Sequence, residues 1–272
     1  MSLFQNILSS VMKGTRRLNR LGSKSFGKLH NDINKAVDSV MSTSGEVSSL
    51  VYAEHLLNLI EAQDDNNLNK FLKNLLSNYD IDTKKLAQDV KNYSSEKNEE
   101  NLIKINHSSE PKWVELFRRL NATSNGTYRL VKLRERIQLL NNPELKIFDS
   151  GLLNLFRYWF NPSFLVLEKI DWETPANILE KIIEYEAVHE INSWDDLRAR
   201  LAPTDRQCFA FFHPLIPDDP LIFVEVALCV GIPKSIQKII KIDRDEIDIE
   251  EANTAIFYSI SNCHNGLLGI SF

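Results

Sequence analysis

The sequence predicts two kinds of structure in succession, an all-α bundle over residues 46–168 and an α+β domain over residues 169–272. In the first stretch apolar residues recur at intervals of three and four, which is helical spacing, and β-branched alternation is absent. Strand-like runs begin only afterwards, at 208–212, 221–228 and 255–261. Strands confined to the second half favour an α+β domain joined to a helical one.

The composition is that of an ordinary globular protein and argues against several classes of function. The chain has 272 residues and a formal net charge of −5, so it lacks the basic surface expected of a nucleic-acid-binding protein. No apolar stretch approaches the roughly 18 residues that span a bilayer, so we expect no contact with a membrane. The 3 cysteines form no CxxC pair, which predicts reduced, buried thiols in a cytoplasmic protein rather than a disulfide framework or zinc site.

Residues 1–45 form a basic N-terminal segment. No Asp or Glu occurs in residues 1–31. This make-up is typical of a mitochondrial presequence, but no cleavage site follows. The interpretation we favour is a flexible or loosely helical N-terminus of a bacterial protein, with the mitochondrial alternative left open. The basic side chains are Lys13, Arg16, Arg17, Arg20, Lys24 and Lys28.

Successive apolar stripes place the helices of the first half. Asp82 is suited to cap a helix, Pro111 to begin one, and Asn161-Pro162 to end the last. The stripes comprise Leu68, Phe71, Leu72, Leu75 and Leu76; Trp113, Leu116, Phe117 and Leu120; Leu130, Leu133, Ile137 and Leu140; and Leu152, Leu155, Phe156 and Trp159.

Helix and turn signals also divide the second half. Thr174-Pro175 predicts a helix that runs to about Tyr185, and Ser193 with Asp196 forms a capping-box-like start for a shorter helix. The segment 217–220, Pro-Asp-Asp-Pro, predicts a turn between the first two strand-like runs.

The sequence holds no motif for metal or nucleophilic chemistry. It has no HExxH, no Cys/His cluster with metal-ligand spacing, no GxSxG elbow and no complete Walker loop. We expect His189 and His213 to be structural or surface residues, and Asp218 and Asp219 to form a turn. Glu225 lies between apolar neighbours, where we expect a paired or strand-edge carboxylate, with a substrate contact as the alternative.

Residues 255–272 hold one candidate binding motif. The run 255–261 has the composition of a buried strand, and a loop with Gly266, Gly269 and Ser271 follows it. A glycine loop after a strand brings backbone N–H groups close to a phosphate, and a following helix N-terminus completes such a site. Because no helix follows, we interpret the chain as a truncated protein.

Several segments of the second half, taken in order, carry a resemblance to one known family. They are Ile182–His189, Asn192–Leu197, Asp205–Cys208, Pro220–Leu228, Ile236–Ile240, Ala255–Ser261 and Gly266–Phe272. Together they resemble the malonyl-CoA decarboxylase family. Residues 133–167 are similar to it as well, whereas the first 130 residues share only helical character.

The resemblance implies a fold and a set of site residues. The family has an N-terminal helical domain that mediates homo-oligomerisation and a catalytic domain similar to the GNAT acyltransferase fold, which binds coenzyme A. Ser259 matches a serine discussed as part of the family's active site. Animal members have a Glu where this sequence has Ser271, so no carboxylate role carries over. The implied substrate and CoA contacts are Tyr258, Ser261, Leu268, Gly269, Ile270, Ser271 and Phe272.

The reaction implied is the conversion of malonyl-CoA to acetyl-CoA and CO2, in fatty-acid or malonate metabolism. The thioester accepts the electron pair that CO2 leaves behind, so no cofactor is expected, while the enolate needs hydrogen-bond donors and an acid. In the family the main Ser and His follow the CoA loop, beyond Phe272. We therefore expect this polypeptide alone to be inactive and to bind CoA poorly.

Two other functions stay open at this point. One is a non-catalytic helical oligomerisation module, and the other is a CoA-dependent GNAT-type acyltransferase that transfers an acyl group to an amine. The oligomeric state of residues 1–165 tests the oligomerisation module. An assay with acetyl-CoA and an amine acceptor distinguishes the acyltransferase from a decarboxylase.

Overall fold

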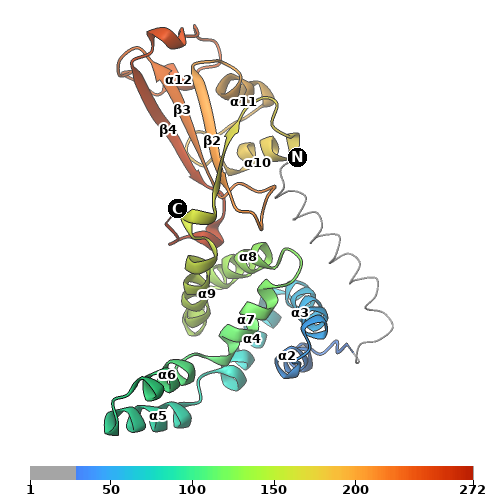
Figure 1. Cartoon of the computed structure of the whole chain (residues 1–272). Coiled ribbons are helices and arrows are strands. Elements are labelled where there is room, and N and C mark those ends of the chain that lie inside the picture. The colour runs from blue at the N-terminus through green and yellow to red at the C-terminus, as the bar shows by residue number, and fades with distance from the viewer. Residues whose placement is uncertain (1–28, 272) are drawn as a thin grey trace. The chain divides into compact units, whose positions relative to one another are not determined.

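The computed structural model describes residues 29–271 and divides into two compact units, Met1–Asn154 and Leu155–Phe272 (Figure 1). The basic residues predicted at the N-terminus lie outside the described residues, as does Phe272. The division falls within helix α9 (Lys146–Trp159), whereas the sequence places the boundary between residues 168 and 169. The apolar periodicity of α9 continues across this division. The sequence therefore gives no sign of it, and the division follows from the tertiary contacts of the two parts of the helix.

The first unit is helical throughout its described elements, as predicted. Asp32, Asp64, Asp82 and Asn98 each cap a helix by accepting a hydrogen bond from a first-turn N–H group, which confirms the cap predicted at Asp82. The helices are α2 (Ile33–Ser42), α3 (Glu46–Glu61), α4 (Asp65–Tyr79), α5 (Thr83–Ser95), α6 (Glu99–Ser108), α7 (Lys112–Asn121) and α8 (Gly126–Leu139), and the 3-10 turn η1 (Pro143–Leu145) precedes α9.

An aromatic cluster lies in the core of the first unit. Trp113, Phe117 and Phe148 are buried, and their rings meet edge to face at centroid distances between 4.9 and 6.0 Å. Gly151 makes room for this cluster, because a Cβ atom there would lie 2.2 Å from Cη2 of Trp113. The close packing of α7 and the first part of α9 therefore depends on a residue without a side chain.

The second unit contains a 4-stranded antiparallel sheet in the order β1-β2-β3-β4. The α+β prediction is confirmed at this level, and Ser193 caps a helix as predicted. β1 is absent from the sequence-based prediction, because Ile170 is its one buried residue. The elements are η2 (Pro162–Phe164), β1 (Val166–Ile170), α10 (Ala176–Tyr185), α11 (Trp194–Leu201), β2 (Arg206–Phe212), β3 (Ile222–Cys229), α12 (Gln237–Ile240), η3 (Ile249–Glu251), β4 (Thr254–Asn262) and η4 (Asn265–Leu267).

Helices α10 and α11 pack on one face of the sheet (Figure 1). Ile182 of α10 and Leu197 of α11 share a buried cluster with Cys208 of β2. The register aligns Cys208 with Glu225 on β3, and Glu225 with Ser259 on β4. Cross-strand partners point to the same side of a sheet, so the covered face carries polar side chains beside its apolar core.

The opposite face, which we call the open sheet face, carries several exposed apolar side chains. Phe257 and Ile260 of β4 are 66% and 60% exposed, and Leu167 of β1 is 55% exposed. The burial predicted for the run 255–261 is therefore wrong at Phe257 and Ile260, because a strand buries both faces only when both are covered. Apolar members of the open sheet face are Leu167, Phe209, Phe211, Ile222, Val224, Phe257 and Ile260, and the register places Lys169, Gln207 and Asn262 on the same side.

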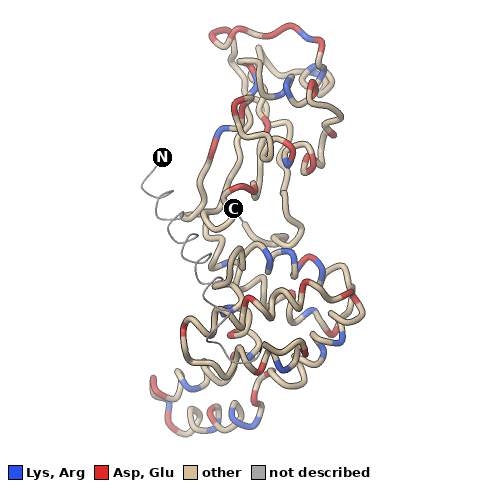
Figure 2. Tube along the Cα trace, turned by 90° about the vertical axis from the view of Figure 1, so that its right-hand side faces the viewer, with Lys and Arg blue, Asp and Glu red and all other residues tan. Residues whose placement is uncertain are grey.

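The connector between α12 and β4 is acidic, and an ion pair attaches it to the sheet. Arg244 donates to both carboxylate oxygens of Asp205, at 2.6 and 2.8 Å, and the N–H group of Ile247 donates to the same carboxylate. Elsewhere charges of both signs are distributed along the chain (Figure 2). Within residues 29–271, no helix combines the length and apolarity required to traverse a bilayer.

Candidate functional site

The glycine loop that follows β4 contains a type II turn. Leu268 has φ −54° and ψ 131°, Gly269 has φ +87°, and the N–H group of Ile270 donates to the carbonyl oxygen of Leu267 at 3.0 Å. Position i+2 of a type II turn requires a positive φ, which glycine adopts without steric conflict. The local sequence thus determines the shape of the loop at Gly269.

The turn presents backbone N–H groups to solvent. Leu268 is 52% exposed, and Gly269 and Ser271 are exposed. Within the described residues no hydrogen bond engages the N–H groups of Gly269 or Ser271, whereas that of Ile270 closes the turn. Unengaged backbone N–H groups in a turn are available to donate to the oxygens of a phosphate group. Phe272, also predicted to contact CoA, lies outside the described residues.

Ser259 and Ser261 lie behind the loop, under the helices, and both meet Glu186. The Ser259 hydroxyl donates to Glu186 at 2.7 Å, and the Ser261 hydroxyl lies 3.4 Å from the same carboxylate. Glu186 also accepts hydrogen bonds from the N–H groups of Val188 and His189, both at 2.7 Å. The sequence-based prediction missed Glu186, and its one local signal is a carboxylate directly after the helix predicted to end near 185.

Tyr258 has no hydrogen bond to Glu186 and packs in a different cluster. The pairing of β3 with β4 shifts register between Glu225 and Val226, so Tyr258 is the extra residue of a bulge. Its ring packs with Ala227, Cys229 and Ile239 in a separate buried cluster. Burial raises the pKa of the Tyr258 hydroxyl well above its usual value. The structure therefore brings Ser259 and Ser261 together but not Tyr258.

Glu225 is fully buried beside Arg200. Oε2 of Glu225 lies 3.4 Å from a guanidinium nitrogen of Arg200, while Oε1 has no hydrogen-bond partner among the described residues. Burial raises the pKa of Glu225 to about 7, against the opposing charge of Arg200. Of the interpretations offered by the sequence, the paired carboxylate is confirmed by this contact with Arg200, and the Glu225 side chain is 0% exposed.

Asp219 connects the β2–β3 turn to two other segments. Its carboxylate lies 2.9 Å from Nζ of Lys181, 3.2 Å from the hydroxyl of Tyr185 and 3.3 Å from Nε2 of His264. Burial disfavours the charged form, but hydrogen bonds from His264 and Lys181 outweigh it and lower the pKa of Asp219. The predicted turn is present, and Asp219 has a further, tertiary role that its position between prolines did not indicate.

Among the histidines and cysteines, His213 and the three cysteines are buried. His213 contacts the carbonyl oxygen of Trp159 through Nε2 at 2.9 Å and packs on Phe160, so it is structural. Cys208, Cys229 and Cys263 are buried thiols. Within residues 29–271, no three or more His, Cys, Asp or Glu side chains are grouped so as to hold a metal ion.

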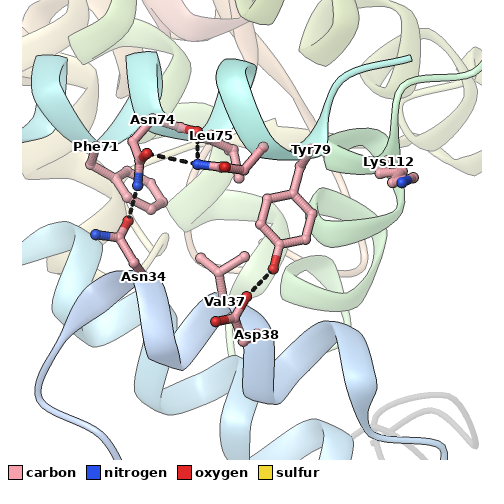
Figure 3. A pocket seen from close by; sticks show the side chains of 9 residues that line it. Asn34, Val37, Asp38, Phe71, Asn74, Leu75, Tyr79 and Lys112 are labelled. Carbon is pink, nitrogen blue, oxygen red and sulfur yellow. Dashed lines mark hydrogen bonds between the residues drawn. The ribbon is translucent and has the colours of Figure 1, made fainter. Parts of the chain in front are cut away.

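A separate pocket of about 420 Å³ lies in the first unit, between α2 and α4. Asn78 donates to Asn74, and Asn74 donates to Asn34 along one side of the pocket, where Figure 3 shows the side chains of Asn74 and Asn34 pointing toward one another. Tyr79 donates to Asp38 across the pocket, and burial together with this carboxylate raises the pKa of Tyr79 to about 12. These polar groups are largely engaged with one another.

Comparison with known proteins agrees with the resemblance. The model of the malonyl-CoA decarboxylase C-terminal domain matches residues 163–272, and the model of the malonyl-CoA decarboxylase N-terminal domain matches residues 79–160. The chain belongs to the malonyl-CoA decarboxylase family. The helical stretch 79–160 and the α+β stretch 163–272 thus correspond to the family's two domains, and neither alternative function is favoured.

Named relatives and solved structures of this family are similar over much of the chain. The mitochondrial malonyl-CoA decarboxylase of Anser anser anser is 37% identical over 176 residues, and that of Rattus norvegicus is 34% identical over 176 residues; each alignment covers 61% of this chain. Crystal structures of malonyl-CoA decarboxylase from Agrobacterium vitis and Rhodopseudomonas palustris match with TM-scores of 0.85 and 0.84 at 45% and 43% identity, covering 89% and 90% of this chain.

The chain is matched to only part of each relative. The alignments cover 34% of the Anser protein and 35% of the Rattus protein. They cover 59% and 60% of the two bacterial chains of known structure. The present chain therefore spans about a third of the curated relatives and about three fifths of the solved ones.

Proposed function

We propose that this chain serves the decarboxylation of malonyl-CoA to acetyl-CoA and CO2, with the loop from Leu267 to Ser271 holding the pyrophosphate of CoA. The observation that carries the proposal is the exposed type II turn at Gly269, with unengaged N–H groups at Gly269 and Ser271. The turn lies directly after β4, within the stretch that matches the family's C-terminal domain. Family membership supports the substrate, and the turn supports the placement of its phosphates.

The chemistry needs few groups from the protein. The bond between the carboxylate and the α-carbon breaks, CO2 leaves, and the electron pair moves onto the thioester oxygen as an enolate. A proton delivered to the α-carbon then gives acetyl-CoA. The thioester carbonyl accepts the electrons itself, so we propose that no metal or organic cofactor takes part. Hydrogen-bond donors toward the enolate oxygen supply the main stabilisation of the transition state.

Ser259 is proposed to serve the site through Glu186. Ser259 is 2% exposed, so it can affect the protein surface only by positioning other residues. Its hydroxyl donates a hydrogen bond to the Glu186 carboxylate. Glu186 in turn orders the backbone of Val188 and His189 after α10. In this role Ser259 is a positioning residue that shapes the surface next to β4 without touching the substrate.

The second unit is proposed to be part of a GNAT-like, CoA-binding domain, supported by its antiparallel sheet and by a glycine loop that follows a strand. We also propose that the helical unit mediates homo-oligomerisation. Support comes from exposed apolar side chains on the α5–α6 pair, where Val90, Leu102 and Ile103 are 45%, 44% and 46% exposed. Light scattering on the full chain tests the assembly.

The compartment is a separate proposal. The buried thiols of Cys208, Cys229 and Cys263 support a reducing compartment such as the cytoplasm. The relatives from Anser anser anser and Rattus norvegicus are named as mitochondrial proteins. Localising the tagged full chain in its own cells distinguishes the two compartments.

Calorimetric titration of the 272-residue chain with CoA and with pantetheine tests the phosphate role. Pantetheine lacks the phosphates, so the wild-type chain should bind CoA more tightly, even if both bind weakly. Gly269→Ala strains the turn at φ +87° and should weaken CoA binding about tenfold without affecting pantetheine. Gly231→Ala is the matched control, because Gly231 also has a positive φ, +71°, but lies after β3. Equal wild-type affinities for CoA and pantetheine would contradict the proposal.

A further inference from the structure

Asp219 is a buried junction between three segments that are distant in sequence. It belongs to the turn between β2 and β3, its partners Lys181 and Tyr185 belong to α10, and His264 lies two residues after the end of β4. Lys181 also donates to the carbonyl oxygen of Asp218 at 2.7 Å, so it holds both the backbone and the side chain of this turn. Asp219 is 5% exposed.

His264 stands at the start of the glycine loop. Its carbonyl oxygen accepts a hydrogen bond from the N–H group of Leu267 at 3.0 Å, which forms the 3-10 turn η4. Leu267 is 4% exposed, and its own carbonyl oxygen accepts the hydrogen bond that closes the type II turn. One chain of contacts therefore runs from Asp219 through His264 and Leu267 to the exposed turn at Gly269.

We propose that Asp219 and His264 are positioning residues that hold the glycine loop in its phosphate-binding conformation, an inference that rests on the proposed function. The carboxylate receives contacts from Lys181, Tyr185 and His264 in a buried site, where an ion pair broken on one side leaves an uncompensated charge. The junction therefore resists any movement of His264 relative to α10. Because His264 is the N-cap residue of η4, restricting His264 also restricts the turn that follows.

The pair acts through the loop and not on the substrate. The side chain of His264 is 0% exposed and that of Asp219 is 7% exposed, so neither reaches a bound ligand. Their effect should appear in the presentation of the N–H groups of Gly269 and Ser271. It should therefore affect ligands that carry the CoA phosphates and spare ligands that lack them.

The test compares Asp219→Asn with Asp218→Asn in the full chain. Asp218 lies in the same turn and contacts Lys181 through its backbone oxygen alone, so D218N is a matched change that leaves the junction intact. Hydrogen exchange at the amides of Leu267, Leu268 and Ile270 reports the loop directly, because each donates within η4 or the type II turn. D219N should speed amide exchange in the loop about tenfold and weaken CoA binding by a similar factor. D218N should change neither the exchange nor the CoA affinity. Pantetheine binding should stay as in the wild type in both variants.

Variants at His264 test the same contact from the other side. His264→Ala should reproduce the loop exchange of D219N, and His264→Gln should restore protection, because its side-chain amide can donate to the Asp219 carboxylate that Nε2 of His264 approaches at 3.3 Å. Unchanged loop exchange in D219N and H264A would overturn the inference, and so would equal losses for CoA and pantetheine. If the wild-type chain does not prefer CoA to pantetheine, the proposed function fails, and the exchange measurements still decide whether Asp219 holds the loop.

Discussion

The hydroxyl of Ser259 lies 2.7 Å from one carboxylate oxygen of Glu186 and 3.0 Å from the other, and both residues are buried. A carboxylate in this position needs its hydrogen bonds, because burial removes the water that would otherwise solvate it. Ser259 and the N–H groups of Val188 and His189 supply them. This arrangement explains why a serine stands on the covered face of β4, among apolar residues.

Ser259→Ala should therefore destabilise the second unit by about 1–3 kcal/mol, because it removes the closest side-chain donor to a buried carboxylate. Ser261→Ala is the matched control, since its hydroxyl lies 3.4 Å from the same oxygen and should cost less. Urea unfolding of both variants measures the difference. Equal free energies of unfolding for S259A and S261A would show that Glu186 does not depend on Ser259.

The carboxyl group of Glu225 should make stability depend on pH. Burial raises its pKa from 4.5 to about 7 in the folded chain, against the charge of Arg200. The folded chain thus holds this proton more tightly than the unfolded chain, so the contribution is complete below about pH 4.5 and is lost as the pH rises through about 7. The loss is on the order of 3 kcal/mol.

Glu225→Gln removes this titration. The difference in free energy of unfolding, E225Q minus wild type, should therefore increase from pH 5 to pH 8. The variant also removes a charged partner of Arg200, so the change with pH is compared and not the value at one pH. Urea midpoints at the two pH values measure the change. Glu168→Gln, at an exposed position on β1, should leave the pH dependence as it is in the wild type. A wild-type stability that does not fall over this range would contradict the burial of an ionisable Glu225.

Gly151→Ala should destabilise the first unit by about 1–3 kcal/mol, because the added methyl group overlaps the ring of Trp113 in a closely packed cluster. The new Cβ would lie 2.2 Å from Cη2 and 2.6 Å from Cζ3 of the indole. Gly45→Ala is the control, since its nearest neighbour, Oγ of Ser48, would lie 3.7 Å away. Unfolding followed by tryptophan fluorescence compares them, and a neutral G151A would show that Trp113 moves aside freely.

The open sheet face should promote self-association of the isolated chain, since a contiguous exposed apolar surface is a site for binding or aggregation. Ile260→Lys interrupts this face with a charge and should lower both the binding of an apolar dye and the light scattering of concentrated solutions. Leu139→Lys, at a position 78% exposed in the first unit, is the control. If both variants lower dye binding equally, the open sheet face has no special role.

The sequence determined the parts of this protein that depend on near neighbours along the chain. Apolar spacing placed the helices, Asp82 and Ser193 marked helix starts, and a glycine marked the turn at Gly269. These features follow from interactions over a few residues, which a sequence displays directly. The ordered segments also carried the resemblance to malonyl-CoA decarboxylase, now supported by matches over residues 79–160 and 163–272.

The tertiary structure decided which side chains meet. Glu186 and Ser259 are 73 positions apart, and no local pattern pairs them. Strand register decided that Ser259 points to the covered face while Ile260 lies on the open one, since neighbouring residues of a strand point to opposite sides. The strand β1, with one buried residue, became a strand only by pairing with β2. Composition expresses the tendency of a segment to be buried, but only the fold supplies the neighbours that bury it.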